Sequence, residues 1–114
     1  MKNTFIKATK SPNGTSFHGG YIRASYNDLA ELFGPHHYGD RYDKVSSGWE
    51  MLHKESNIIF TIYDWKQYYS SPVTNKNTIY DFHIGTLTEE ETNIVVNALC
   101  DIGFDAYVEK FHLM

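Results

Sequence analysis

Cysteine is nearly absent from this sequence: Cys100 is the only one among 114 residues. A single thiol excludes an internal disulfide and a zinc site built from several cysteines. A lone cysteine is typical of proteins in a reducing cytoplasm. Because Cys100 lies in a segment with helical spacing, we expect it to be a small buried core residue and not a nucleophile.

The sequence also lacks long apolar runs and runs of basic residues. No stretch approaches the roughly 18 apolar residues of a membrane span, and the first residues lack the apolar core of a signal peptide. Lysine and arginine number 10 against 14 acidic residues, which gives a net charge of -4. Because proteins that bind phosphate backbones are normally basic, we expect no extended nucleic-acid partner and no membrane partner. A small anion held by one or two cations is compatible with this balance.

Recognisable catalytic and metal-binding motifs are missing as well. The sequence has no His-Glu-x-x-His motif, no phosphate-cradling glycine loop and no cysteine–histidine dyad, so we predict no catalytic residue, metal or cofactor. Phe82-His-Ile-Gly-Thr86 faintly matches the histidine–threonine pairs of two-histidine phosphoesterases, but Thr86 is three residues past His83 and no second copy exists. A small hydrolase that uses His83 with Asp81 or Tyr63 is therefore kept as an alternative.

Aromatic residues, by contrast, are abundant. They make up 16% of the chain, with 9 Tyr, 7 Phe and 2 Trp, which is more than a small core usually needs. Some rings should therefore lie on the surface, where aromatic side chains signal an interface or a ligand platform.

Two helices are marked by their ends. Ser25 is a suitable N-cap for a helix whose apolar face repeats at helical spacing, and Gly34-Pro35 stops it. Thr88-Glu-Glu-Glu91 is a capping box that begins the second helix, and Gly103 ends it. We expect the buried stripe of this second helix to contain Glu91, Val95, Ala98, Leu99 and Ile102.

Alternating segments predict the strands. In 57–63, Ile58, Phe60 and Ile62 point to one side, and little polarity on either side favours a central strand. Residues 15–24 alternate only loosely, with Gly19-Gly20 as a break or a bulge, so whether this segment forms a strand stays open. Other strands are expected within 4–9, 48–53, 77–85 and 104–111. The prediction is a single α+β domain over 1–114, with two layers: an antiparallel or mixed sheet of four to five strands and two helices on one face.

The motif Tyr63-Asp64-Trp65-Lys66 is the first candidate site, where a strand ends. Tyr63 and Trp65 can stack on a base or a partner side chain, and Lys66 can meet a phosphate or carboxylate. The alternative is a turn in which Asp64 caps backbone amides and Trp65 completes the core.

The other candidates flank the first helix or lie on a strand. Tyr21 and Arg23 precede the helix, and Arg23 can bind an anion there or form a surface ion pair. An irregular loop follows the helix, and loops often carry function. Its candidates, with His83 from a later strand, complete the predicted binding set: His36, His37, Tyr38, Arg41, Tyr42 and His83.

Several of these stretches resemble a group of small accessory proteins encoded by bacteriophages and large DNA viruses. The resemblance covers roughly 14–85 and rests on Gly20-Tyr-Ile-Arg-Ala-Ser-Tyr26, Thr61-Ile-Tyr-Asp-Trp-Lys66 and Phe82-His-Ile-Gly85. The chain departs from the group at His36-His37 and in the loop 68–77. The resemblance implies a viral protein made in the host cytoplasm, but no transferable activity.

The function expected from the sequence is binding without catalysis. The chain would bind and neutralise or modulate a host component, either a host protein in an anti-defence role or a small nucleotide signal. A virion or assembly protein that oligomerises through a strand edge is a further alternative.

Overall fold

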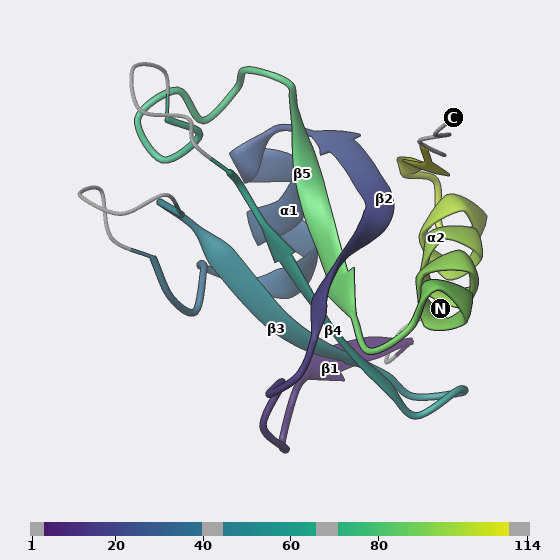
Figure 1. The fold of residues 1–114 in the computed structure, drawn as a ribbon. Helices are drawn as coiled ribbons and strands as arrows, with labels where there is room; N and C mark the ends of the chain where they lie inside the picture. The colour runs from purple at the N-terminus through teal and green to yellow at the C-terminus, as the bar shows by residue number, and fades with distance from the viewer. Residues whose placement is uncertain (1–3, 40–44, 66–70, 110–114) are drawn as a thin grey trace.

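The computed structural model describes residues 4–39, 45–65 and 71–109. The elements along the chain are β1 (Phe5–Lys7), β2 (Ser16–Ala24), α1 (Tyr26–Phe33), β3 (Gly48–His53), β4 (Ile58–Tyr63), β5 (Tyr80–Thr86), α2 (Glu89–Asp101) and β6 (Asp105–Val108). The strands form one sheet in the order β1-β3-β4-β5-β2-β6, and every strand pairing is antiparallel (Figure 1). The predicted α+β class is confirmed.

The sheet has six strands where four to five were expected, and β2 explains the difference. It is one continuous strand of nine residues that pairs with both β5 and β6. Phe17 pairs with Gly85 and Gly20 with Ile84, so three steps along β2 match one step along β5. The expected break at Gly19-Gly20 is therefore a bulge within one strand. Gly19 is required there because its φ is +89° and a Cβ would lie 2.6 Å from the Glu109 carbonyl oxygen.

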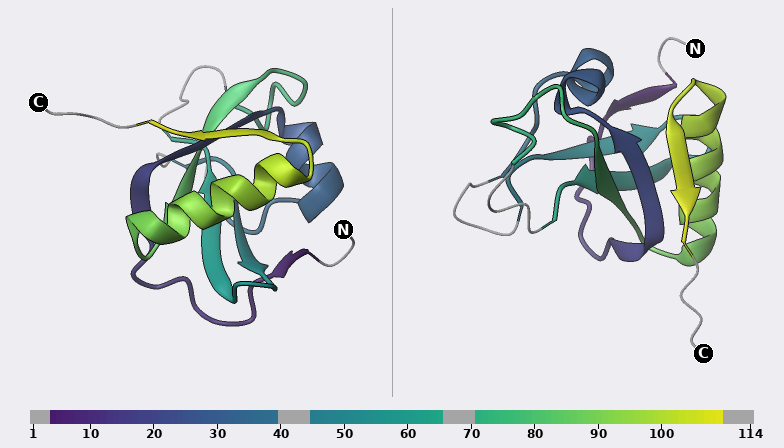
Figure 2. Two further views of the ribbon diagram at one scale, coloured as in Figure 1. Left: turned by 90° about the vertical axis from the view of Figure 1, so that its right-hand side faces the viewer. Right: turned by 90° about the horizontal axis from the view of Figure 1, so that it is seen from above.

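One face of the sheet, the inner face, forms the core with the helices. Alternate residues of the central strands, such as Ile22, Ile62 and Phe82, are fully buried on it. Helix α2 lies close against β2 because Gly20 has no side chain; a Cβ there would lie 2.5 Å from Thr92 Cγ2. Figure 2 shows α2 lying across this side of the sheet, beside β6. The predicted central position of 57–63 is confirmed by β4, and Ile58, Phe60 and Ile62, which were expected on one side, are all buried.

The helix ends follow the predicted caps. Ser25 and Asp28 form a reciprocal capping box at the start of α1, and the Thr88 side chain accepts a hydrogen bond from the Glu91 amide of α2. Gly34 ends α1 with φ +85°. Helix α1 packs at one end of the inner layer, where the Tyr26 and Trp49 rings lie 5.4 Å apart.

The buried side of α2 differs from the predicted stripe. Its buried residues are Thr92, Val95, Val96 and Leu99, whereas Glu91, Ala98 and Ile102 are only partly buried. The helix is turned so that Thr92 faces Gly20, where a hydrogen bond of 2.6 Å joins the hydroxyls of Thr92 and Thr86. A polar residue thus occupies a core position because its hydroxyl has a buried partner.

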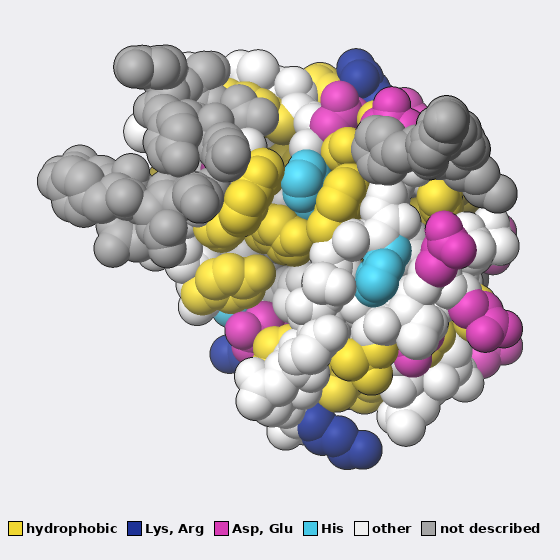
Figure 3. All heavy atoms as spheres, in the orientation of Figure 1, with side chains coloured by type: hydrophobic (Ala, Val, Ile, Leu, Met, Phe, Trp, Pro, Cys, Tyr) yellow, Lys and Arg dark blue, Asp and Glu magenta, His cyan; other side chains and the backbone are white. Residues whose placement is uncertain are grey.

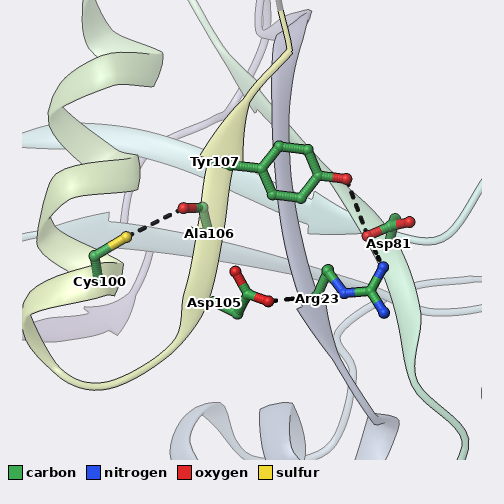
Figure 4. A network of polar contacts seen from close by, with 6 residues as sticks. All are labelled: Arg23, Asp81, Cys100, Asp105, Ala106 and Tyr107. Carbon is green, nitrogen blue, oxygen red and sulfur yellow. Dashed lines mark hydrogen bonds and ion pairs between the residues drawn. The ribbon is translucent and has the colours of Figure 1, made fainter.

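The prediction of a buried Cys100 is wrong. Cys100 is exposed near the end of α2, outside the buried side of that helix. Its thiol donates a 3.1 Å hydrogen bond to the carbonyl oxygen of Ala106 in β6 (Figure 4). The residue therefore links the helix to the neighbouring strand instead of filling the core.

Candidate binding surface

Four ring-bearing residues lie side by side across the opposite, outer face of the sheet. The strand register pairs Tyr63 of β4 with His83 of β5, His83 with Tyr21 of β2, and Tyr21 with Tyr107 of β6. Successive rings of this row have centroids 5.5, 5.3 and 5.2 Å apart. Because directly opposed residues point to the same side of a sheet, four adjacent strands build one continuous row.

Two more rings pack around His83. Phe17 stacks on it at 4.1 Å, and the Trp65 ring lies 6.2 Å away in a nearly parallel plane. The bulge in β2 keeps Phe17 on the side of Gly85, its pairing partner, whose missing side chain leaves room beside Tyr63. We call the set of six residues the aromatic face: Phe17, Tyr21, Tyr63, Trp65, His83 and Tyr107.

The aromatic face is neither sealed nor covered by a helix. Trp65 is 39% exposed, and the other five residues are partly buried. Both helices contact inner-face residues, as the Gly20–Thr92 and Tyr26–Trp49 contacts show. Figure 3 views the molecule from the outer side and shows a histidine with hydrophobic side chains around it. Over the described residues, the rings are therefore accessible to a partner.

His83 is neutral at the centre of these rings. Burial lowers the pKa of its imidazole below the ordinary 6.5, and the nearby Asp64 carboxylate opposes this effect only partly. Within the described part of the chain, no hydrogen bond joins the His83 ring nitrogens to another residue. The imidazole thus offers one donor and one acceptor within an apolar surrounding.

Asp64 fixes the strand end from which Trp65 projects. Its carboxylate is 1% exposed and accepts hydrogen bonds from the backbone amides of Ser46 and Ser47, at 2.9 and 2.7 Å. The hydroxyl groups of the same two serines also donate to it, at 2.7 and 3.3 Å. Asp64 therefore caps backbone amides, as one reading of the motif held, while Trp65 stays on the surface and does not complete the core.

Charged residues flank one end of the aromatic face. Arg23 lies between Asp81 and Asp105, its cross-strand partners, with N–O distances of 3.4 and 3.7 Å (Figure 4). These ion pairs are loose and exposed, so their contribution to stability is small. The Tyr107 hydroxyl donates to the same Asp81 oxygen at 3.1 Å.

Glu109 adds a third carboxylate to this end. Burial, together with the charge of this carboxylate, raises the pKa of Tyr21. Burial and the hydrogen bond to Asp81 raise the pKa of Tyr107 to about 12. Both phenols are therefore protonated donors at neutral pH. We call Asp81, Asp105 and Glu109 the acidic rim.

The loop after α1 contributes one ring to the outer side. Tyr38 lies over Gly48, where any side chain would collide with it, and forms a side-chain hydrogen bond with Thr61. Because Gly48 pairs with Tyr63, Tyr38 continues the aromatic face toward β3. Burial raises the pKa of the Tyr38 hydroxyl.

The two adjacent histidines have local partners instead. His36 Nδ1 is 2.8 Å from the Tyr26 hydroxyl, and His37 Nδ1 accepts the Glu50 amide hydrogen at 2.9 Å. Burial lowers the pKa of His37, in agreement with a neutral ring that accepts a backbone amide. The structure thus assigns both histidines contacts that hold the loop, and it does not bring them to the aromatic face.

Three of the predicted site residues lie outside the described residues: Arg41, Tyr42 and Lys66. Conversely, Phe17 and Tyr107 belong to the surface but were not predicted. The alternation of 104–111 places Tyr107 with the acids Asp105 and Glu109, but only the strand order places it beside Tyr21. Phe17 was concealed by the bulge.

An open groove of about 1230 Å³ adjoins the acidic rim. It lies between α1, β1 and the turn from α2 to β6, and it shares Arg23 and Asp105 with the rim. Its other carboxylates are Asp28, Glu31 and Asp101, and exposed Leu32 provides an apolar wall. The acidic character of the rim therefore continues into the groove.

Comparisons with known proteins identify no relative. No family model, curated protein or solved structure matches the chain. Among the described residues, no helix is long and apolar enough to cross a membrane. Over those same ranges, no three His, Cys, Asp or Glu residues are grouped so that they could hold a metal ion.

Proposed function

We propose that this chain is a binding protein without catalytic activity, which docks a partner protein on its aromatic face. One observation carries the proposal: a continuous row of rings crosses four adjacent strands on the sheet face that no described helix covers. Tyrosine and tryptophan are the side chains that contribute most to protein interfaces, because they bury large areas at small entropic cost.

The sequence resemblance supplies the biological setting of the proposal. A viral accessory protein in the host cytoplasm would use this surface to neutralise or modulate a host protein. This part of the proposal rests on the resemblance alone, whereas the docking surface rests on geometry.

A small nucleotide signal is less compatible with the surface than a protein is. The rings pack against one another, as Phe17 does on His83 and Tyr21 on Tyr107, so their inner faces are already occupied. A phosphate also needs a cation, and Arg23 is held by two carboxylates. Within the described residues, a base that stacks on Trp65 would gain about 1–3 kcal/mol from stacking, and Arg23 would add no phosphate contact.

The hydrolase alternative lacks the geometry of a catalytic pair. A general base is normally oriented by a hydrogen-bonded third group. Asp81 is bonded to Tyr107 and Arg23, and the Tyr63 ring meets His83 edge to face without a hydrogen bond. A turnover that disappears in His83→Ala but leaves the fold intact would restore this alternative.

Affinity capture from extracts of the cells in which the chain is made tests the proposal. Wild type should retain one partner; Trp65→Ala and Tyr21→Ala should each lose at least about 90% of it, since hot-spot rings contribute 2 kcal/mol or more. Ile94→Ala is the matched control, because Ile94 on α2 has the same exposed fraction as Trp65, 39%. The proposal is contradicted if the aromatic-face variants retain the partner. It is also contradicted if wild type captures no partner and calorimetry with a panel of nucleotides shows no binding. Light scattering shows whether self-association through a strand edge competes.

A further inference from the structure

We infer that the partner docked on the aromatic face presents a basic segment, whose arginine or lysine side chains reach the acidic rim. This inference rests on the proposed function and specifies the chemistry of the partner. Its main basis is the charge of the surface beside the rings that define the docking face.

The described part of the outer surface is negative at the end formed by β5, β2 and β6. Asp81, Asp105 and Glu109 contribute three negative charges, and Arg23 is the positive charge that the described structure places among them. A further cation is therefore attracted there, whereas a phosphate or an acidic peptide is repelled.

The rim carboxylates keep capacity for such a cation. The contacts of Asp81 with Tyr107 and Arg23 both use Oδ1, and Asp105 meets Arg23 through Oδ2. The second oxygen of each carboxylate has no hydrogen bond to the described residues. Arg23 meets both carboxylates at N–O distances of 3.4 and 3.7 Å, which are long for a charge-assisted hydrogen bond, so a closer cation can compete for the same oxygens.

The neighbouring rings favour the same ligand chemistry. The Tyr21 and Tyr107 planes lie 24° apart with centroids 5.2 Å apart, and the Tyr107 hydroxyl is bonded to the Asp81 carboxylate. A cation above the electron-rich face of a ring is attracted by the negative charge of that face. Rings beside carboxylates therefore bind an arginine or lysine side chain better than either group does alone.

Because of the groove, the ligand that fits is a segment of polypeptide and not a single side chain. Asp28, Glu31 and Asp101 continue the negative charge beyond Asp105, and Leu32 offers an apolar contact among them. A basic stretch with interspersed apolar residues can thus run from the aromatic face into the groove. A second copy of this chain does not fit, because its own outer face and its net charge of -4 are negative.

Two synthetic peptides of equal length test the inference. One alternates arginine with leucine, and the other alternates glutamate with leucine; ADP is the third probe. Fluorescence of Trp65, with Trp65→Phe to subtract the buried Trp49, reports binding at the face. We expect saturable binding of the arginine peptide, weakened by added salt because exposed charges are screened within about 10 Å at 0.1 M ionic strength.

Charge-neutral variants locate that binding. Asp81→Asn and Asp105→Asn should each weaken the arginine peptide about fivefold, the value of an exposed ion pair of about 1 kcal/mol. Glu55→Gln removes the same charge from the exposed turn between β3 and β4 and should leave affinity unchanged. The inference is overturned if the arginine peptide does not bind, if the glutamate peptide binds equally well, or if ADP binds more tightly. It is also overturned if Asp81→Asn and Glu55→Gln have equal effects.

The outcome is separable from that of the proposed function. A captured partner that depends on Trp65 but docks through an acidic segment refutes the basic ligand and keeps the docking face. An arginine peptide whose affinity is unchanged in Tyr21→Ala binds elsewhere and refutes the inference as well.

Discussion

The two faces of the same strands use apolar side chains in opposite ways. On the inner face, Ile22, Ile62 and Phe82 are fully buried under helices. On the outer face, their neighbours Tyr21, Tyr63 and His83 are rings, and each carries a polar group and remains partly exposed. The inner side chains are apolar and buried in the core. The outer side chains combine an apolar ring with a polar group at its tip, which is typical of residues at protein interfaces.

Strand alternation thus separates stability from binding within one sheet. A small domain needs its inner face to offset the conformational entropy of folding. The outer rings contribute some burial by packing on one another, as Phe17 and His83 do at 4.1 Å. Their polar groups nevertheless make the remaining ring surface inexpensive to expose to water, and a partner can bury that surface on binding.

Substitutions on the two faces should differ most in the free energy of unfolding. Phe82→Ala should lower the free energy of unfolding by about 3–5 kcal/mol, because it opens a cavity in the core. Tyr21→Ala, one strand away on the outer face, should cost about 1 kcal/mol, as partly exposed positions usually do. Urea denaturation measures both. Equal losses would mean that the outer rings are core residues.

The next effect tests how the outer face is held in place. Asp64→Asn should lower the free energy of unfolding by about 3 kcal/mol, since a hydrogen bond to a charged group contributes about 1.5–3 kcal/mol and several are weakened. Acrylamide quenching of Trp65 should change as well, because Asp64 fixes the strand end beside it. Glu55→Gln serves as the exposed control, and a loss no larger than that of the control would contradict the role of Asp64.

The smallest effect is a pH dependence centred on His83. Burial lowers its folded pKa below 6.5, so the unfolded chain binds a proton in a pH range where the folded chain does not. The resulting stability is complete above pH 6.5 and is lost as the pH falls from there through the folded pKa. His37 acts in the same direction. The effect is modest because the half-exposed ring is screened by water.

Urea denaturation at a series of pH values, repeated on His83→Gln, isolates the contribution of this histidine. The variant should show a shallower loss of stability on acidification. NMR titration of the imidazole provides the direct reading. A pKa of His83 at or above 6.5 in the folded chain would contradict the buried environment that the rings create.

Local chemistry made much of the fold predictable from the sequence. The caps at Ser25 and Thr88 depend on residues a few positions apart, and the sides of β4 follow from strict alternation. The second-helix stripe and Cys100 were misplaced because helical spacing allows two neighbouring stripes, and only the contact of Thr92 with Gly20 selects one.

The candidate site was predictable only in part, because residue type can be read from the sequence whereas neighbours across strands cannot. Tyr21, Tyr63, Trp65 and His83 stood out by residue type, and the structure brings them together. Tyr107 and Phe17 could not be added, because their neighbours depend on strand order and on a bulge. His36 and His37 looked chemically promising, yet their partners come from distant segments that the sequence does not place.

Site-specific photo-crosslinking tests the docking face most directly. A photoreactive phenylalanine analogue replaces Trp65 on the outer face or Ile94 on α2, two positions of equal 39% exposure. In cells that contain the natural partner, we expect a discrete adduct from position 65 and none from position 94. Adducts from position 94 alone, or from both positions equally, would contradict it.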